Sequence, residues 1–172
     1  MAVAPSTRGF GFALLEGLDT LADWGVTSVT GDKNTQSVAK VKELIAHYQP
    51  DVLVLEDTST KPFRRSERIR RLSRQIIALA ATRKVSVALF SRERVRQVFF
   101  ADGQGTKHAL AEILVQQFPE ELGSRLPPKR CPWMSEDSRM YIFDAVALAL
   151  MLRLKKARPT CLTEQRQRRR KC

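Results

Sequence analysis

The stretch that decides the fold is Val52-Leu53-Val54-Leu55-Glu56-Asp57, in which four apolar residues run directly into two carboxylates. A continuous run of β-branched and leucine residues predicts a strand that is buried on both faces of a sheet. A carboxylate at the end of such a strand lies at the rim of the sheet, where binding sites are usually placed. Glu56 is therefore a candidate site residue, whereas Asp57 should point the other way and cap the following turn.

A second carboxylate, Asp144, interrupts the apolar helix that is predicted around residues 142–150. A charged side chain is costly among apolar ones, so its presence favours a role such as holding a cation together with Glu56. Each acid also has a structural explanation. Glu56 would pair with an arginine of the next helix, and Asp144 would accept a hydrogen bond from a backbone or side-chain donor.

Apolar periodicity along the chain predicts the order β-β-β-α-β-α-β, followed by further helices. Three closely spaced strands form an antiparallel meander, and helical crossovers add two more strands. The sequence thus predicts an α/β domain over residues 1–154, with a mixed five-stranded sheet flanked by helices. The first expected strand is short and ends at residues 3–4, and the other four span 9–15, 21–29, 52–56 and 85–90. The expected helices span 38–48, 69–79, 93–99, 107–118 and 135–154.

The chain carries a formal net charge of +12, which favours a polyanionic partner, nucleic acid before an anionic membrane. Residues 155–172 contain eight Lys or Arg against one Glu and predict a disordered basic tail that adds phosphate contacts, or else only solubility. No apolar run reaches the ~20 residues of a membrane helix. The first residues show no secretory signal, so a cytoplasmic protein without a membrane partner is expected.

Arginine is concentrated in residues 64–74, which hold six arginines against one acid. Guanidinium groups match phosphate oxygens, so this segment predicts a nucleic-acid-binding surface, with a solvated helix face as the alternative. The predicted contacts are Arg64, Arg65, Arg68, Arg71 and Arg74, with Arg96 and Lys107 further downstream, and Arg92 and Arg94 would extend the same basic surface.

An aromatic residue follows a second basic segment. Residues 127–132, Pro-Pro-Lys-Arg-Cys-Pro, predict a loop that leads into the last helix, and Trp133 comes directly after it. Trp133 is expected to anchor that loop, with stacking on a nucleobase as the alternative.

The element order, with Glu56 at the end of the fourth strand and Asp144 on the last helix, resembles the ribonuclease H-like superfamily. Within it, the chain is most similar to the RuvC Holliday-junction resolvases. The resemblance covers roughly residues 1–154. It rests on residues 4–11, 54–57, 95–97 with 106–107, and 143–149.

The resemblance implies a nuclease site for DNA recombination, in which carboxylates hold two Mg²⁺ (or Mn²⁺) ions and a basic pair faces the DNA backbone. On this basis Glu56, Asp144 and Lys107 form the catalytic set, and Asp137 joins Glu56 and Asp144 as a metal ligand. Arg96 and Lys107 would contact the scissile phosphate. The resemblance also implies a homodimer.

The sequence departs from that pattern at two positions. Ala4 occupies the first-strand position where resolvases carry the central metal-bridging Asp, and Tyr141 occupies the position one turn before Asp144. Asp137 would compensate if it projected from the same helix face as Asp144, two turns or ~10 Å away. The alternative is that Glu136 and Asp137 are acids in the first turn of that helix, favoured by its dipole.

Three classes of function follow from the sequence. The first is a RuvC-like nucleic-acid-binding protein that recognises branched or distorted DNA, with Mg²⁺-dependent endonuclease activity left open because Ala4 replaces the expected ligand. The second is a binding module for DNA or RNA that has kept the fold and lost the metal site. The third is a ribosome- or RNA-associated factor, for which the basic tail would matter most. DNA is favoured over RNA as the partner.

Overall fold

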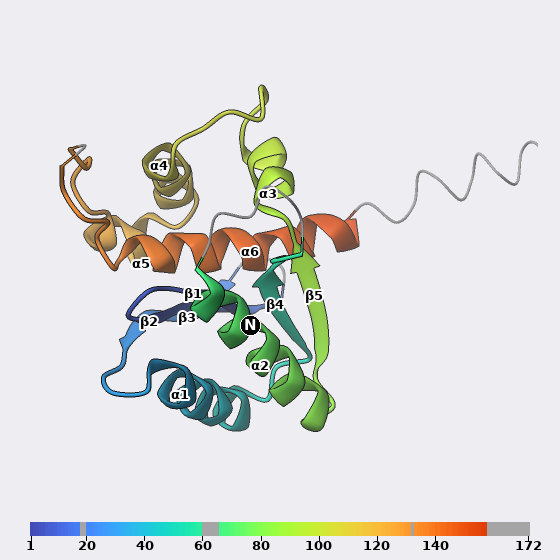
Figure 1. Ribbon diagram of the computed structural model, residues 1–172. Coiled ribbons are helices and arrows are strands. Elements are labelled where there is room, and N and C mark those ends of the chain that lie inside the picture. Colours follow the sequence, from blue (N-terminus) through green and yellow to red (C-terminus); the bar gives the residue numbers. More distant parts are fainter. Residues whose placement is uncertain (18–19, 60–65, 132, 158–172) are drawn as a thin grey trace, which may run out of the picture.

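The computed structural model describes residues 1–17, 20–59, 66–131 and 133–157, and its elements follow the predicted order (Figure 1). The strands are β1 (Ala2–Pro5), β2 (Gly9–Glu16), β3 (Thr20–Ser28), β4 (Val52–Glu56) and β5 (Ser86–Phe90). The helices are α1 (Lys33–Tyr48), α2 (Glu67–Thr82), α3 (Arg92–Phe99), α4 (Lys107–Gln117), α5 (Pro119–Leu122) and α6 (Met140–Ala157), with a 3-10 turn η1 (Gly123–Arg125).

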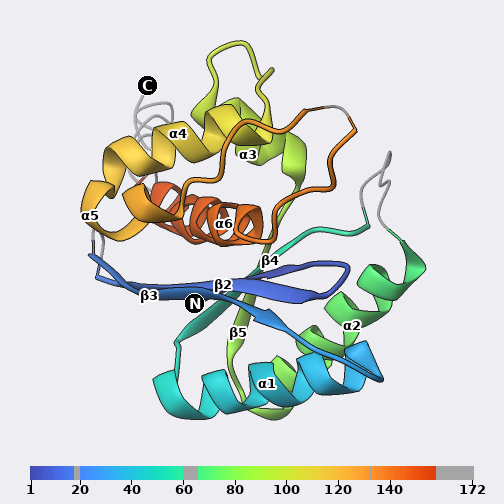
Figure 2. The same ribbon diagram turned by 90° about the vertical axis from the view of Figure 1, so that its left-hand side faces the viewer.

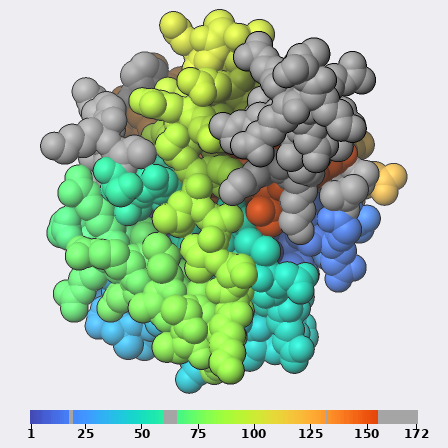
Figure 3. Space-filling view, turned by 90° about the vertical axis from the view of Figure 1, so that its right-hand side faces the viewer, coloured from blue at the N-terminus to red at the C-terminus, as the bar shows by residue number. Residues whose placement is uncertain are grey.

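The strands form one sheet in the order β3-β2-β1-β4-β5. β1 pairs antiparallel with β2, and β2 pairs antiparallel with β3. β4 pairs parallel with both β1 and β5, because α1 and α2 carry the chain back across the sheet between these strands. The predicted mixed α/β sheet is therefore confirmed. The outer strand β5 lies between α2 and α3 on the face of the molecule seen in Figure 3.

Helices cover both faces of the sheet, so the domain has two apolar cores (Figure 2). The core beneath α1 and α2 includes Val3, Phe10, Leu53 and Leu55. The core beneath α6 takes the alternate residues of the same strands, including Ala2, Ala4, Ala13 and Val54. This division follows from strand geometry, in which successive side chains point to opposite faces.

α6 is enclosed along most of its length by the sheet on one side and α4 on the other, which explains why its sequence is apolar all round. Small side chains allow it to lie close to the strands. At Gly11 on β2, even a single Cβ atom would overlap with the backbone carbonyl of Tyr141 on α6. Only glycine fits there, so position 11 sets how deeply α6 rests on the sheet.

Helix boundaries differ from the predictions where side chains cap the chain. α1 begins five residues earlier than expected, because the Asp32 side chain accepts hydrogen bonds from the backbone N–H groups of Asn34 and Thr35. α6 begins at Met140 rather than at 135, and it continues to Ala157, three residues into the segment predicted as a disordered tail. Residues 158–172 of that tail lie outside the described residues. Across the described ranges, no helix combines the length and apolar character needed to cross a membrane.

Candidate nucleic-acid interface

The strand register brings two of the singled-out positions together. Ala2 of β1 pairs in parallel with Val54 of β4, so two residues further along each strand Ala4 lies beside Glu56. Ala2 and Val54 both belong to the core beneath α6. Because side chains alternate along a strand, Ala4 and Glu56 face α6 as well. Asp57, by contrast, turns away and accepts a hydrogen bond from the backbone N–H of Ser59 at 2.8 Å, as predicted.

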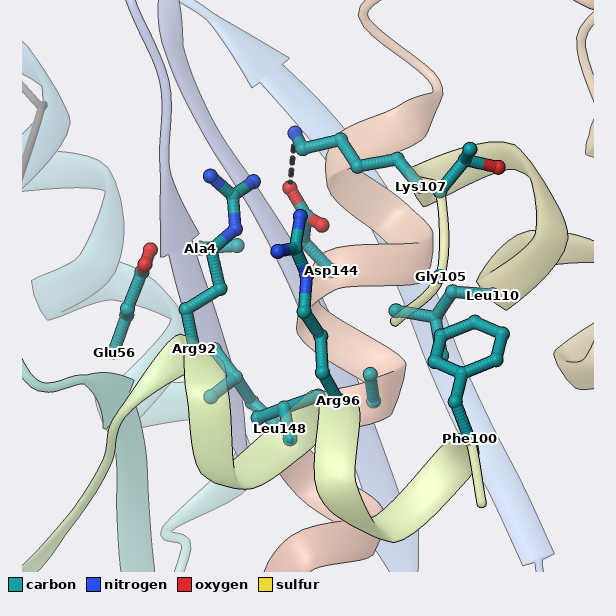
Figure 4. Close-up of a pocket in the computed structure, with 13 residues that line it drawn as sticks. Ala4, Glu56, Arg92, Arg96, Phe100, Gly105, Lys107, Leu110, Asp144 and Leu148 are labelled. Atoms are coloured by element: carbon teal, nitrogen blue, oxygen red, sulfur yellow. Dashed lines mark hydrogen bonds and ion pairs between the residues drawn. The ribbon is translucent and has the colours of Figure 1, made fainter. Parts of the chain in front are cut away.

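Asp144 of α6 lines the same cleft as Ala4 and Glu56, so the two acids found in the sequence lie at one edge of the sheet. Figure 4 shows Ala4 between them in this view. The opposite wall comes from α3, whose Arg92 and Arg96 are one helical turn apart and extend into the cleft. Their positions follow from Ser91, which comes directly after β5 and caps α3 by accepting a hydrogen bond from the backbone N–H of Arg94.

Lys107, the first residue of α4, connects two acids at the mouth of the cleft. Its Nζ atom lies 2.8 Å from Asp144 Oδ2 and 2.7 Å from Glu136 Oε1, and 5.1 Å from the centre of the Tyr141 ring. Burial alone would lower the pKa of the Lys107 ammonium, but the carboxylates of Asp144 and Glu136 outweigh burial and raise this pKa above its usual value. Lys107 is therefore a fixed positive charge at neutral pH.

The α3 side of the cleft favours an anion. The lining has three cationic side chains, Arg92, Arg96 and Lys107, and two carboxylates, Glu56 and Asp144. Because Asp144 and Glu136 both pair with Lys107, the positive charge that an anion can meet is that of Arg92 and Arg96. Apolar residues complete the wall and exclude water from part of it. These are Val95, Phe100, Leu110, Ala147 and Leu148. A surface with two guanidinium groups beside apolar walls suits a phosphate group.

The same residues do not fit a centre of two magnesium ions. Such a centre needs several carboxylate oxygens, but β1 presents the methyl group of Ala4, and the Asp144 carboxylate already holds the Lys107 ammonium. Within the described ranges, no group of three or more His, Cys, Asp or Glu side chains is placed to hold a metal ion. The roles of Glu56, Asp144 and Lys107 in metal binding and catalysis stay predictions.

Asp137 does not occupy the place predicted for it. Because α6 begins at Met140, Asp137 is not on the helix, and it is not among the residues that line the cleft. Its carboxylate accepts hydrogen bonds from the backbone N–H of Arg139 at 2.9 Å and from the Arg139 guanidinium at 2.7 Å. The guanidinium also holds the pKa of Asp137 below its usual value. Glu136 likewise precedes the helix, so the explanation by the helix dipole was wrong for both acids.

Solved structures share this architecture. The structure of Thermus thermophilus RuvC matches the chain with a TM-score of 0.64 and 17% identity, over 90% of this chain and 93% of that one. The structure of the T. thermophilus RuvC in complex with a Holliday junction substrate matches with a TM-score of 0.60 and 18% identity, over 90% and 92%. The chain has the RuvC fold. No protein-family model and no curated protein matches the sequence.

Within this RuvC fold, two of the α2 arginines that were predicted to contact DNA bind groups of the chain itself. The guanidinium of Arg68 donates to Asn34 Oδ1 at 2.9 Å and to the backbone carbonyl of Ser6, so it joins α2 to α1 and to the turn after β1. Arg74 pairs with Glu67 at 2.6 Å. Arg71 is exposed, and Arg64 and Arg65 lie outside the described residues. Arg68 therefore has a structural role, and its contact with nucleic acid stays a prediction.

Two residues of the cleft region were missed by the sequence reasoning. Arg92 was noted only as an extension of the basic surface, although its spacing of four residues from Arg96, directly after a strand and a serine cap, was a usable signal. Glu136 carries no such signal. Its partner Lys107 is 29 positions away, and only the tertiary structure brings the two together at 2.7 Å.

Proposed function

We propose that this chain is a nucleic-acid-binding protein that recognises branched or distorted DNA through the cleft at the edge of its sheet. The observation that carries the proposal is that the guanidinium groups of Arg92 and Arg96 extend together into this cleft from one face of α3. The formal net charge of +12 supports a polyanionic partner. The likeness to a RuvC that is in complex with a Holliday junction substrate supports branched DNA as that partner.

The roles of the cleft residues follow from their contacts. Arg92 is exposed and Arg96 half-buried on one face of α3, where both guanidinium groups can donate to one phosphate or to two consecutive phosphates. Lys107 is held by Asp144 and Glu136, which balance its charge and fix its place at the mouth of the cleft. Glu56 repels phosphate oxygens and confines the DNA backbone to the α3 side of the cleft.

The test is the affinity of the chain for four DNA probes of matched length: a four-way junction, a Y-shaped fork, a linear duplex and a single strand. We expect the junction to bind roughly tenfold more tightly than the duplex, with affinity that falls steeply as salt rises. An RNA junction of the same sequence is the control for the kind of nucleic acid. Equal affinity for junction and duplex, or tighter binding to RNA, would contradict the proposal.

Mg²⁺-dependent cleavage is the second candidate, and the placement of Glu56 and Asp144 in one cleft is the observation that favours it. We expect the wild-type chain to leave a four-way junction intact in Mg²⁺ or Mn²⁺, because Ala4 and Lys107 stand where further ligands are needed. Nicking by the wild type, abolished in Glu56→Gln, would make the chain an endonuclease. Nicking only by Ala4→Asp would show that the missing β1 carboxylate is what prevents cleavage.

A further inference from the structure

The largest exposed apolar side chains of the described chain include two consecutive residues of the loop that precedes Glu136, the partner of the cleft residue Lys107. Trp133 is 84% exposed and Met134 is 51% exposed. Trp133 therefore does not anchor its loop, and that prediction was wrong. Exposing an indole and a thioether side by side leaves a large apolar area in water, which is typical of a binding surface.

The loop that carries them is fixed at both ends to the first turn of α4. His108 Nε2 lies 3.1 Å from the carbonyl oxygen of Pro127, where the loop begins. Lys107 Nζ lies 2.7 Å from Glu136, where the loop ends. Figure 2 shows this segment passing α4 and turning back into α6. Because Lys107 itself lines the cleft, the loop has a fixed place at the rim of the cleft.

A turn within the loop presents the two side chains outward. The backbone N–H of Met134 donates to the carbonyl oxygen of Cys131 at 3.0 Å, which closes the chain around Trp133. Lys129 and Arg130, just before this turn, are both exposed. The surface thus combines a flat aromatic ring with positive charges, next to a cleft that suits phosphate. A nucleobase on a DNA backbone has the complementary chemistry, a π face attached to negative charge.

We propose that Trp133, with Met134 beside it, stacks on an unpaired or unstacked base of the DNA that the cleft holds. The inference rests on the proposed function and deepens it, because it names what distinguishes branched DNA from a linear duplex. Bases at a branch point or a mismatch can leave the helical stack at little cost, whereas those of a regular duplex cannot. Trp133 then supplies preference for the distorted structure, and the cleft supplies sequence-independent affinity.

The first test compares Trp133→Ala and Trp133→Phe on a four-way junction with two unpaired thymines at its centre and on a linear duplex. We expect Trp133→Ala to bind the junction roughly tenfold more weakly, within the range for one stacked base, and to bind the duplex within twofold of the wild type. Trp133→Phe keeps an aromatic face and should retain most of the junction affinity. Leu89→Ala, which removes another exposed apolar side chain, is the matched control and should change neither affinity.

The second test uses intrinsic fluorescence, because the chain has two tryptophans and Trp24 is half-buried. Adding the same junction should quench the emission of the wild-type protein, and the quenching should be lost in Trp133→Phe. Stacking on a base brings about this quenching, whereas a merely structural role of Trp133 would not.

The outcomes separate the two proposals. If Trp133→Ala and the wild type bind the junction equally and no quenching occurs, while Arg92→Ala/Arg96→Ala loses binding, the stacking inference fails and the proposed function stands. If Trp133→Ala instead abolishes self-association in sedimentation with DNA affinity unchanged, the apolar pair docks a second copy, and the inference is overturned. If the wild type binds no nucleic acid, both fail.

Discussion

Two helices of this protein are rich in arginine, and they use it differently. On α2, Arg68 bonds to Asn34 and Ser6, and Arg70 and Arg74 lie 3.7 and 2.6 Å from Glu67. On α3, Arg92 and Arg96 line a cleft that also contains Glu56 and Asp144. The α2 cluster is the denser of the two in the sequence, yet α3 places its charges at the edge of the sheet where the chemistry of the site converges. The density of arginine in the sequence therefore does not by itself predict the binding surface, because the partners of each arginine in the folded chain differ.

The largest effect is expected on DNA affinity. Arg92→Ala/Arg96→Ala should weaken junction binding roughly 30-fold, because each lost guanidinium–phosphate contact is worth about 1 kcal/mol at an exposed site. The slope of log affinity against log salt should fall by about 2, since two phosphate contacts are removed. Titrations at several salt concentrations measure both.

The matched control is Arg70→Ala/Arg74→Ala on α2, which removes the same charge. It should leave affinity within about threefold and the salt slope nearly unchanged. An equal loss in the two double variants would show that both helices touch the DNA and would abolish the contrast drawn between them.

The next effect is on stability. Arg68→Ala should lower the free energy of unfolding by about 2 kcal/mol, because it leaves buried Asn34 and the Ser6 carbonyl without a charged donor. Arg71→Ala, one turn further along and exposed, should change it by less than about 0.5 kcal/mol. Urea denaturation measures both variants. If Arg68→Ala leaves the free energy of unfolding unchanged and weakens DNA binding, Arg68 contacts DNA and is not mainly structural.

The smallest effect concerns Lys107 and pH. Its pKa in the folded chain is raised above the unfolded value, so its ion pairs contribute stability that is fully present below about pH 10.4 and is lost as the pH rises through the folded-state pKa. The free energy of unfolding of the wild type should therefore fall more steeply above about pH 10.4 than that of Lys107→Met. Parallel curves for the two proteins would contradict this role of the Asp144–Lys107–Glu136 contacts.

Much of the fold was predictable because its signals are local. The run at β4 is continuous, apolar and bounded, and the stripe of Ile69, Leu72 and Ile76 repeats at helical spacing and is buried. The start of α6 was not predictable in this way. It depends on Asp137 accepting from the backbone of Arg139 and on Glu136 reaching Lys107, and both contacts are properties of the folded chain.

The same contrast between local signals and contacts of the folded chain applies to the candidate site. Glu56 and Asp144 stand out because each is a carboxylate among apolar neighbours, and strand order and helix order are enough to place them at one edge. The structural role of Arg68 could not be predicted, for a different reason. An arginine that faces solvent and one that bonds to Asn34 look alike in a sequence, since the partner lies 34 positions away.

One residue without a side chain governs the geometry of the whole cleft. Gly11 lets the backbone of α6 touch β2 at Tyr141, and Asp144 follows one turn later on the same helix. Were the helix lifted by the thickness of a methyl group, Asp144 and Lys107 would move away from Glu56 together. The width of the cleft therefore depends on position 11 of β2, where there is room only for the hydrogen atom of glycine. Substitutions among the charged residues can retune what the chain binds, whereas a change at position 11 would alter the aperture itself.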